Sequence, residues 1–343
     1  MPFEVSRPVR LMEVCGTHTM AIAKAGLKQL LPPEIKLVSG PGCPVCVTPA
    51  GAIDGVLELA MHPDVVIASY GDLLRVPGSV RGDSLNTRRA KGADVRVVYS
   101  PVDGVELAKA LPHKQVVFLG VGFETTAPGT AAAILTARQE GVENFSVLPL
   151  LKYTLPAVKT LMEDPACGVD GLLCPGHVAT ILGAEAFRFL PEQYGKTAVV
   201  GGFDTPDVVE AVELLARLTA EGKPQLVNAY PRGVRPQGNP IARERMDRVF
   251  CPKDDVWRGL GLIPQSGMAI REEFAPWDAS VKFRFHPENK EIGTPCRCGD
   301  VLRGVLEPGQ CPLFGKLCTP ADPVGPCMVS GEGSCSAAYK YRL

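Results

Sequence analysis

The pattern of apolar positions divides the chain into a regular part and an irregular tail. Up to about residue 225, short continuous runs of Val, Ile and Leu alternate with segments of helical periodicity. Continuous apolar runs are typical of parallel strands that are buried on both faces. They predict eight strands, at residues 10–16, 35–40, 64–70, 95–100, 116–122, 145–151, 171–176 and 197–203. Helices are predicted between them, for example at 19–31, 50–61, 129–141 and 206–222.

This alternation predicts an α/β fold with doubly wound parallel sheets of the Rossmann-like kind, because parallel strands need right-handed crossovers. Eight strands suffice for two such domains, which we expect at residues 1–112 and 113–225. Residues 230–240 are rich in Pro and Gly and predict an extended loop. The segment 226–343 is expected to form a third, cysteine-rich domain, whose folding a bound metal centre would support.

Composition narrows the class of protein. The 343 residues include 36 Lys and Arg against 37 Asp and Glu, a net charge of −1, so no basic surface for nucleic acid is expected. The sequence shows no signal-peptide pattern and no apolar run of membrane-spanning length, and we therefore expect a cytoplasmic protein without a membrane partner. In a reducing cytoplasm, the 12 cysteines are more often metal ligands or redox groups than disulfides.

Six of these cysteines lie in the tail. Cys311, Cys318, Cys327 and Cys335 are separated by 7, 9 and 8 positions, wider than the close pairs that are usual in zinc sites. Loops of this length can wrap a [4Fe–4S] cluster held by four thiolates, although the spacing equally allows a tail stapled by zinc or disulfides. Cys296 and Cys298 are candidates for redox groups near the cluster or for one of its ligands.

Two cysteine motifs follow predicted strands near the amino terminus, at the sheet edge where α/β proteins place their sites. Cys15 in CGTHT (15–19) ends a strand and opens a helix, whose dipole should lower the thiol pKa. His18 could support the thiolate or a bound metal, or be only a capping or core histidine. Cys43 and Cys46 in GPGCPVCVTP (40–49) have the spacing of a redox pair, and iron binding together with Cys15 is a further interpretation. A zinc knuckle would need a second C-x₂-C, which is missing.

Two further motifs carry weaker signals. GVGFETTAPGT (120–130) is a strand-to-helix turn with an incomplete Rossmann fingerprint, and Glu124 within it could face a site between the domains. A helix start capped by Thr125 or Thr126 explains the motif equally well. Cys174 and His177 in CPGHVATI have metal-capable spacing, and no ATP-binding motif is visible.

Taken together, the motifs resemble those of the hydrogenase maturation factor family HypD. The resemblance is carried, in this order, by CGTHT (15–19), GPGCPVCVTP (40–49), GFETTAP (122–128), CPGHVATI (174–181), YPRGVRPQGN (230–239), PCRCGDVLRG (295–304), and CPLFGKLCTP with GPCMVSGEGSC (311–335). Seven segments in one order are much more specific than any single motif.

The resemblance implies an assembly factor with redox activity that helps to build the Fe(CN)₂CO unit of [NiFe]-hydrogenases. It implies that Cys15 is the ligand of that iron and that Cys43 and Cys46 are the redox pair beside it. It also implies that Cys311, Cys318, Cys327 and Cys335 hold a [4Fe–4S] cluster. The implied partners are a HypC-type chaperone, HypE as cyanide donor with HypF behind it, and the hydrogenase large subunit downstream.

Two alternatives remain at this stage. An iron–sulfur-dependent thiol-disulfide oxidoreductase would reduce the Cys43–Cys46 pair for a protein substrate and could function without Cys15. A non-enzymatic protein with a structural zinc tail would be colourless. No motif of ordinary substrate turnover is evident in the sequence.

Overall fold

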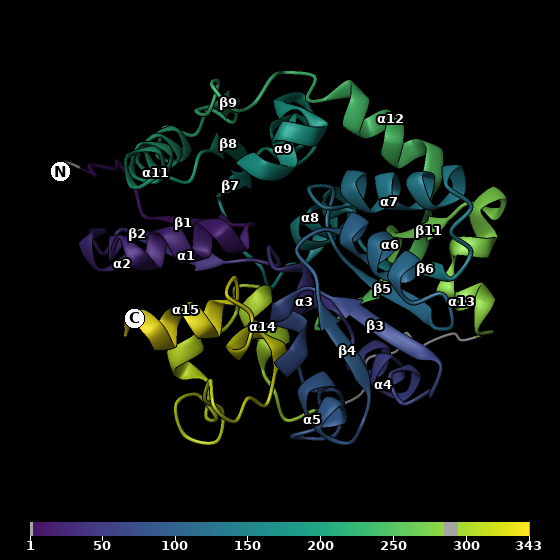
Figure 1. Ribbon diagram of the computed structural model, residues 1–343. Coiled ribbons are helices and arrows are strands. Elements are labelled where there is room, and N and C mark those ends of the chain that lie inside the picture. Colours follow the sequence, from purple (N-terminus) through teal and green to yellow (C-terminus); the bar gives the residue numbers. More distant parts are fainter. Residues whose placement is uncertain (1–2, 285–293, 343) are drawn as a thin grey trace.

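Two parallel β-sheets form the centre of the molecule (Figure 1), in a computed structural model that describes residues 3–284 and 294–342. Sheet A has the strand order β2-β1-β7-β8-β9, and sheet B has the order β4-β3-β5-β6. Every pairing within these two sheets is parallel. The predicted α/β class with parallel, Rossmann-like sheets is confirmed.

All eight predicted strands are present. Sheet A contains β1 (Val9–Glu13), β2 (Ile35–Ser39), β7 (Gly171–Pro175), β8 (Thr197–Gly201) and β9 (Leu226–Asn228). Sheet B contains β3 (Val65–Ser69), β4 (Asp94–Val97), β5 (Gln115–Gly122) and β6 (Phe145–Leu151). The additional strand β9 is an edge strand of three residues, too short to leave a pattern in the sequence.

Two separate segments of the chain form sheet A. The chain leaves this sheet after β2, completes sheet B, and returns at β7, where Leu11 of β1 pairs with Gly171. Residue 112 therefore does not separate the sheets, since β3 and β4 precede it and β5 and β6 follow it within sheet B. Apolar runs reveal strands but not their partners, so the pairing of β1 with β7 could not be read from them.

Helices cover both faces of each sheet. One face of sheet A carries α1 (Gly16–Lys24), α2 (Leu27–Leu30) and α11 (Thr205–Ala220), and the other carries α8 (Thr154–Glu163), α9 (Gly176–Leu182) and α10 (Phe189–Tyr194). One face of sheet B carries α6 (Pro101–Ala110), α7 (Ala127–Gln139) and α12 (Pro240–Val249), and the other carries α3 (Pro44–Val47), α4 (Ala50–Leu59) and α5 (Leu85–Ala90). The predicted helix 19–31 is divided into α1 and α2 at Gly26, whose positive φ of 62° breaks the helix.

An antiparallel hairpin follows α12 and packs against β6. Its strands are β10 (Phe250–Trp257) and β11 (Gly261–Ile270), and α13 (Ala279–Lys282) comes after it. Lys152, next to the end of β6, forms an ion pair of 2.5 Å with Asp255, and their side chains are only 3% and 5% exposed. The hairpin was missed in the sequence because Pro, Lys and Asp interrupt its apolar positions.

The tail consists of short helices that lie against elements from the start of the chain (Figure 1). Helix α15 (Ser334–Tyr341) packs on α1, and the turn η5 packs on α3. Helix α14 (Cys298–Leu302) precedes them. The short 3₁₀ segments are η1 (Gly71–Arg75), η2 (Ala184–Phe187), η3 (Glu272–Trp277), η4 (Pro308–Gln310) and η5 (Pro326–Met328). No helix in the described ranges is long and apolar enough to cross a membrane.

Candidate metal and redox site

Cys15 lies just beyond the carboxyl end of β1, where the chain turns into α1. Its backbone is extended, with φ −151° and ψ 122°, and its carbonyl accepts a hydrogen bond of 3.0 Å from the N–H of Thr19. The residue is therefore the N-cap of α1, at the helix start that the sequence predicted. The side chain is 7% exposed, and its sulfur is hydrogen-bonded by the backbone N–H of His18.

The pKa of Cys15 differs from the sequence expectation. Burial raises it to about 12 without a bound metal, and the nearby carboxyls of Glu332 and Glu13 raise it further. Backbone N–H groups at the start of α1 act in the opposite direction, as a helix N-terminus should, but the loss of hydration is the larger effect. The prediction that the helix would favour a free thiolate is therefore wrong for the unliganded side chain.

The loop with Cys43 and Cys46 packs directly on Cys15. The N–H of Gly16 donates to the carbonyl of Gly42 at 2.9 Å, and a Cβ atom at Gly42 would overlap the backbone of Cys15. Cys43 and Cys46 form a disulfide with Cα atoms 5.2 Å apart, and Cys43 caps α3. The second cysteine motif is thus held beside the first.

The carboxyl-terminal segment before α15 completes this surface. The hydroxyl of Thr17 donates to Glu332 at 2.9 Å, and a Cβ atom at Gly16 would overlap Glu332. Oγ of Ser330 lies 3.3 Å from Sγ of Cys43 in a hydrogen bond. Three segments that are distant in sequence therefore meet around Cys15.

Four cysteines of the tail form an electrostatic group. Burial raises the pKa of Cys335, and the neighbouring thiols of Cys298, Cys318 and Cys311 raise it further. The N–H of Val324 donates to the sulfur of Cys318 at 3.4 Å. Two of the four side chains, Cys298 and Cys318, are buried, and the other two are half-buried.

Cys327, predicted from its spacing as a cluster ligand, adjoins the same thiols, and Cys298, Cys335 and Cys296 all raise its pKa. It is 1% exposed and belongs to the apolar core that also contains Cys43 and Cys46. Hydrogen bonds from Cys296 and Cys327 lower the pKa of Cys298, and the guanidinium of Arg258 lowers it further. Cys298 and Cys327 therefore belong to one core, and Cys335 and Cys296 pack against it.

The tail offers thiols as its candidate metal ligands. Among the described residues, no three His, Cys, Asp or Glu side chains are close enough to hold one metal ion. A [4Fe–4S] cluster is larger than an ion, so its four thiolates lie farther apart, and cysteine is its usual ligand. Four thiols grouped around Cys335 provide a donor set that fits such a cluster.

His18 does not support Cys15 through its side chain. The ring is fully buried, its Nε2 lies 2.9 Å from the carbonyl oxygen of Gly202, and it stacks on Phe203 with ring centres 4.6 Å apart. Burial lowers the pKa of His18 to about 4, so the ring is neutral at physiological pH. These contacts fit the alternative of a core histidine.

Glu124 has a structural role in its surroundings. Its carboxylate accepts hydrogen bonds from the backbone N–H of Thr154 at 2.8 Å and from the Thr154 hydroxyl at 2.6 Å, at the start of α8. Burial raises the pKa of Glu124. The carboxylate thus satisfies the amino end of a neighbouring helix.

Cys174 and His177 are held by separate surroundings. Cys174 is fully buried in the core beside β7, whereas His177 is exposed and stacks on Phe203 with ring centres 3.7 Å apart. The two side chains therefore pack against other residues despite their metal-capable spacing.

Sequence reasoning missed four residues that touch the cysteines: Glu13, Arg258, Ser330 and Glu332. Glu13 is 1% exposed, accepts hydrogen bonds from the Thr19 hydroxyl at 2.6 Å and from the N–H of Cys15 at 3.2 Å, and burial raises its pKa to about 7. Glu13 and Glu332 flank cysteine motifs, and this adjacency was the available signal. Ser330 and Arg258 carry no recognisable spacing.

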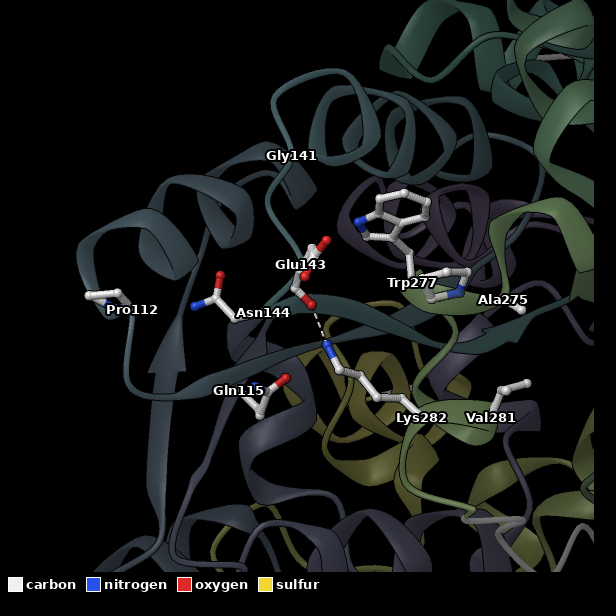
Figure 2. Close-up of a pocket in the computed structure, with 10 residues that line it drawn as sticks. Pro112, Gln115, Gly141, Glu143, Asn144, Ala275, Trp277, Val281 and Lys282 are labelled. Atoms are coloured by element: carbon white, nitrogen blue, oxygen red, sulfur yellow. Dashed lines mark hydrogen bonds between the residues drawn. The ribbon is translucent and has the colours of Figure 1, made fainter.

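A cavity of about 940 Å³ lies away from this site (Figure 2). Its lining includes Gln115 and Asn144, at the amino ends of β5 and β6, and Lys282, which donates a hydrogen bond to the carbonyl of Glu143. Ligands of open parallel sheets bind at the carboxyl ends of the strands. With no cysteine in its lining, this cavity is separate from the thiol groups.

The fold and the site define a cysteine-rich α/β protein in which thiols from both ends of the chain share one region. Residues 2–342 match the family model described as "HypD: Hydrogenase formation hypA family". The chain is 43% identical to hydrogenase maturation factor HypD2 of Bradyrhizobium diazoefficiens, over 98% of this chain and 90% of that protein. It is 42% identical to hydrogenase maturation factor HypD of Escherichia coli K12, over 100% of this chain and 91% of that protein. The chain belongs to the HypD family of hydrogenase maturation factors.

Proposed function

We propose that this protein is the scaffold on which iron receives its cyanide and carbon monoxide ligands during [NiFe]-hydrogenase maturation. The observation that carries the proposal is the meeting of Cys15, the Cys43–Cys46 pair and the segment 330–335 at one place. The iron and its ligands are the cargo of the protein, and the cysteines are its working groups.

Cys15 is the proposed anchor of the iron. Low-spin iron that carries cyanide and carbon monoxide suits a soft anionic ligand, which a thiolate provides. The high pKa of the free thiol means that iron binding must displace its proton, as is usual for cysteine ligands. A buried thiol that is anionic only with its metal is protected from other reactions.

The Cys43–Cys46 pair is the proposed source of two electrons. Release of cyanide from a protein-bound thiocyanate breaks a carbon–sulfur bond, consumes two electrons and leaves a thiolate. Oxidation of two thiols to a disulfide supplies two electrons and releases two protons. The loop contact between Gly42 and Gly16 keeps this pair next to the anchor.

The tail is proposed to hold a [4Fe–4S] cluster, which passes electrons one at a time. Cys311, Cys318 and Cys335 remain three of the proposed ligands. For the fourth we favour Cys298 over the predicted Cys327, because hydrogen bonds from Cys296 and Cys327 lower the pKa of Cys298, whereas the hydrogen bond to Cys298 and burial raise the pKa of Cys327. The loss of bound iron and sulfide should therefore be much larger in Cys298→Ser than in Cys327→Ser.

The proposed partners follow from the family. A HypC-type chaperone would share the iron, HypE would deliver cyanide received through HypF, and the large subunit of a hydrogenase would receive the product. The protein is proposed to work in the cytoplasm, where thiolates persist.

Infrared spectroscopy of the protein purified anaerobically with its HypC-type partner tests the scaffold role. We expect cyanide and carbon monoxide stretching bands in the wild type, none in Cys15→Ala, and unchanged bands in Cys251→Ala, a control thiol on the hairpin. Bands that persist in Cys15→Ala would refute the anchor. An oxidoreductase that acts on disulfides would show no such bands in any form.

A further inference from the structure

Arg258 is a buried cation next to the tail thiols. The residue is 4% exposed, and its side chain lines a cavity of about 390 Å³ together with Cys296 and Cys298. Its Nη2 lies 3.4 Å from the hydroxyl of Thr294, and its buried Nη1 has no hydrogen-bond partner among the residues that the structure describes. Arg258 and Cys298 line the same cavity, and the guanidinium lowers the pKa of the Cys298 thiol.

The backbone fixes Arg258 between two cysteine segments. Its N–H donates to the carbonyl of Val47, the last residue of α3, at 2.8 Å. Gly259 and Gly299 follow Arg258 and Cys298, and their backbones touch so closely that a Cβ atom on either would overlap the other. The φ of Gly259 is +79°, which also favours glycine. The turn therefore directs the arginine from the disulfide segment toward α14.

A buried guanidinium needs a counter-charge. Removal of a cation from water is costly unless an anion is close. Among the described residues no carboxylate forms an ion pair with Arg258, whereas Arg297 and Arg303 in the same cavity both pair with Asp300. Among the described residues that line this cavity, Asp300 is already paired with Arg297 and Arg303, and the other groups that can carry negative charge are the sulfurs of Cys296 and Cys298.

We propose that Arg258 is the positioning residue that sets the reduction potential of the tail sulfur centre. The inference rests on the proposed [4Fe–4S] cluster. A cluster gains negative charge when it is reduced, and a fixed cation beside one of its sulfurs stabilises the reduced form. Hydrogen bonds to the sulfurs, net charge and solvent exposure are the factors by which proteins adjust such potentials. Arg258 contributes a hydrogen-bond donor and a positive charge, at a site that excludes most water.

Redox titration of the purified protein, followed by electron paramagnetic resonance, tests this role. Arg258→Gln removes the cation, and we expect a more negative potential with normal iron and sulfide content. Thr294→Asp keeps the arginine and gives it a competing carboxylate, and it should shift the potential in the same direction. Arg297→Met is the matched control: it removes a cation of the same cavity that is 52% exposed and paired with Asp300, so its shift should be the smallest.

The outcomes separate this inference from the proposed function. A wild-type protein that binds no cluster after anaerobic reconstitution refutes the cluster itself. A normal cluster whose potential stays at the wild-type value in Arg258→Gln and Thr294→Asp overturns only the role of Arg258. If Arg258→Gln fails to retain iron, Thr294→Asp alone decides between a shifted and an unchanged potential.

Discussion

The side chains around Cys15 show how burial can outweigh a helix dipole. The N-terminus of α1 directs N–H groups at the sulfur, yet the pKa of Cys15 is raised to about 12 because almost no water reaches it. The buried Glu13 beside it is affected in the same way, with a pKa raised to about 7 by burial. Burial therefore favours the neutral form of Cys15 and brings the pKa of Glu13 close to physiological pH.

Alkylation should reveal the raised pKa of Cys15. In reduced, metal-free protein at pH 8, we expect Cys15 to react with iodoacetamide roughly 100-fold or more slowly than a peptide of the same local sequence, because little thiolate is present. The rate should keep rising with pH beyond the range in which the peptide reaches its plateau. Peptide mass spectrometry measures both rates, and equal rates at pH 8 would disprove a raised pKa.

Glu13 should make stability depend on pH. A carboxyl whose pKa is raised by folding stabilises the protein below its unfolded pKa, near 4.5, and loses that contribution as pH rises through about 7. Compared with Glu13→Gln, the wild type should therefore lose about 3 kcal/mol of unfolding free energy between pH 4.5 and pH 8. Urea unfolding at the two pH values measures the difference, and a constant difference would contradict a shifted carboxyl.

At the scale of the elements, close backbone contacts between turns and helices hold the site together. The turn before α3 approaches the turn before α1 at Gly42, and the hairpin turn approaches α14 at Gly259. Neither approach leaves room for a side chain. The hairpin itself is tied to β6 by the buried Lys152–Asp255 pair, which links the turn with Arg258 to the framework of sheet B.

A side chain at Gly42 should separate the two amino-terminal cysteine motifs. Gly42→Ala places a methyl group against the backbone of Cys15, which cannot yield easily. We expect a loss of about 1–3 kcal/mol in the free energy of unfolding, measured with urea. Gly309→Ala is the control, because no atom lies within 4 Å of the added methyl group. Equal stability of the two variants would argue against the close contact.

Removal of the buried lysine should weaken the hairpin. Lys152→Met leaves the carboxylate of Asp255 buried without this cation, and we expect a loss of about 3–5 kcal/mol in unfolding free energy. Arg96→Met breaks an exposed pair with Asp94 and should cost at most about 1 kcal/mol. Thermal and urea unfolding compare the two, and similar losses would contradict the buried pair.

At the scale of the whole molecule, the sequence predicted the individual strands and motifs better than the way they pack together. Continuous apolar runs located eight strands because each strand is buried on both faces, and local motifs located Cys15 and the Cys43–Cys46 pair. The pairing of β1 with β7 and the position of the tail depend on contacts between distant residues, which leave no periodic signal. For the same reason, Arg258 could not be recognised before the fold was known.

The arrangement predicts two separate kinds of iron in one protein. One is a single iron at Cys15, and the other is a cluster in the tail. Loss of the Cys15 thiol should remove the single iron and leave the cluster, because the two groups lie on different elements.

Mössbauer spectroscopy of the ⁵⁷Fe-labelled complex with the HypC-type partner tests this central claim most directly. The account predicts a low-spin iron signal that disappears in Cys15→Ala and a cluster signal that remains in it, whereas the cluster signal disappears in Cys335→Ser. A single kind of iron, or one that is unaffected by Cys15→Ala, would contradict the account.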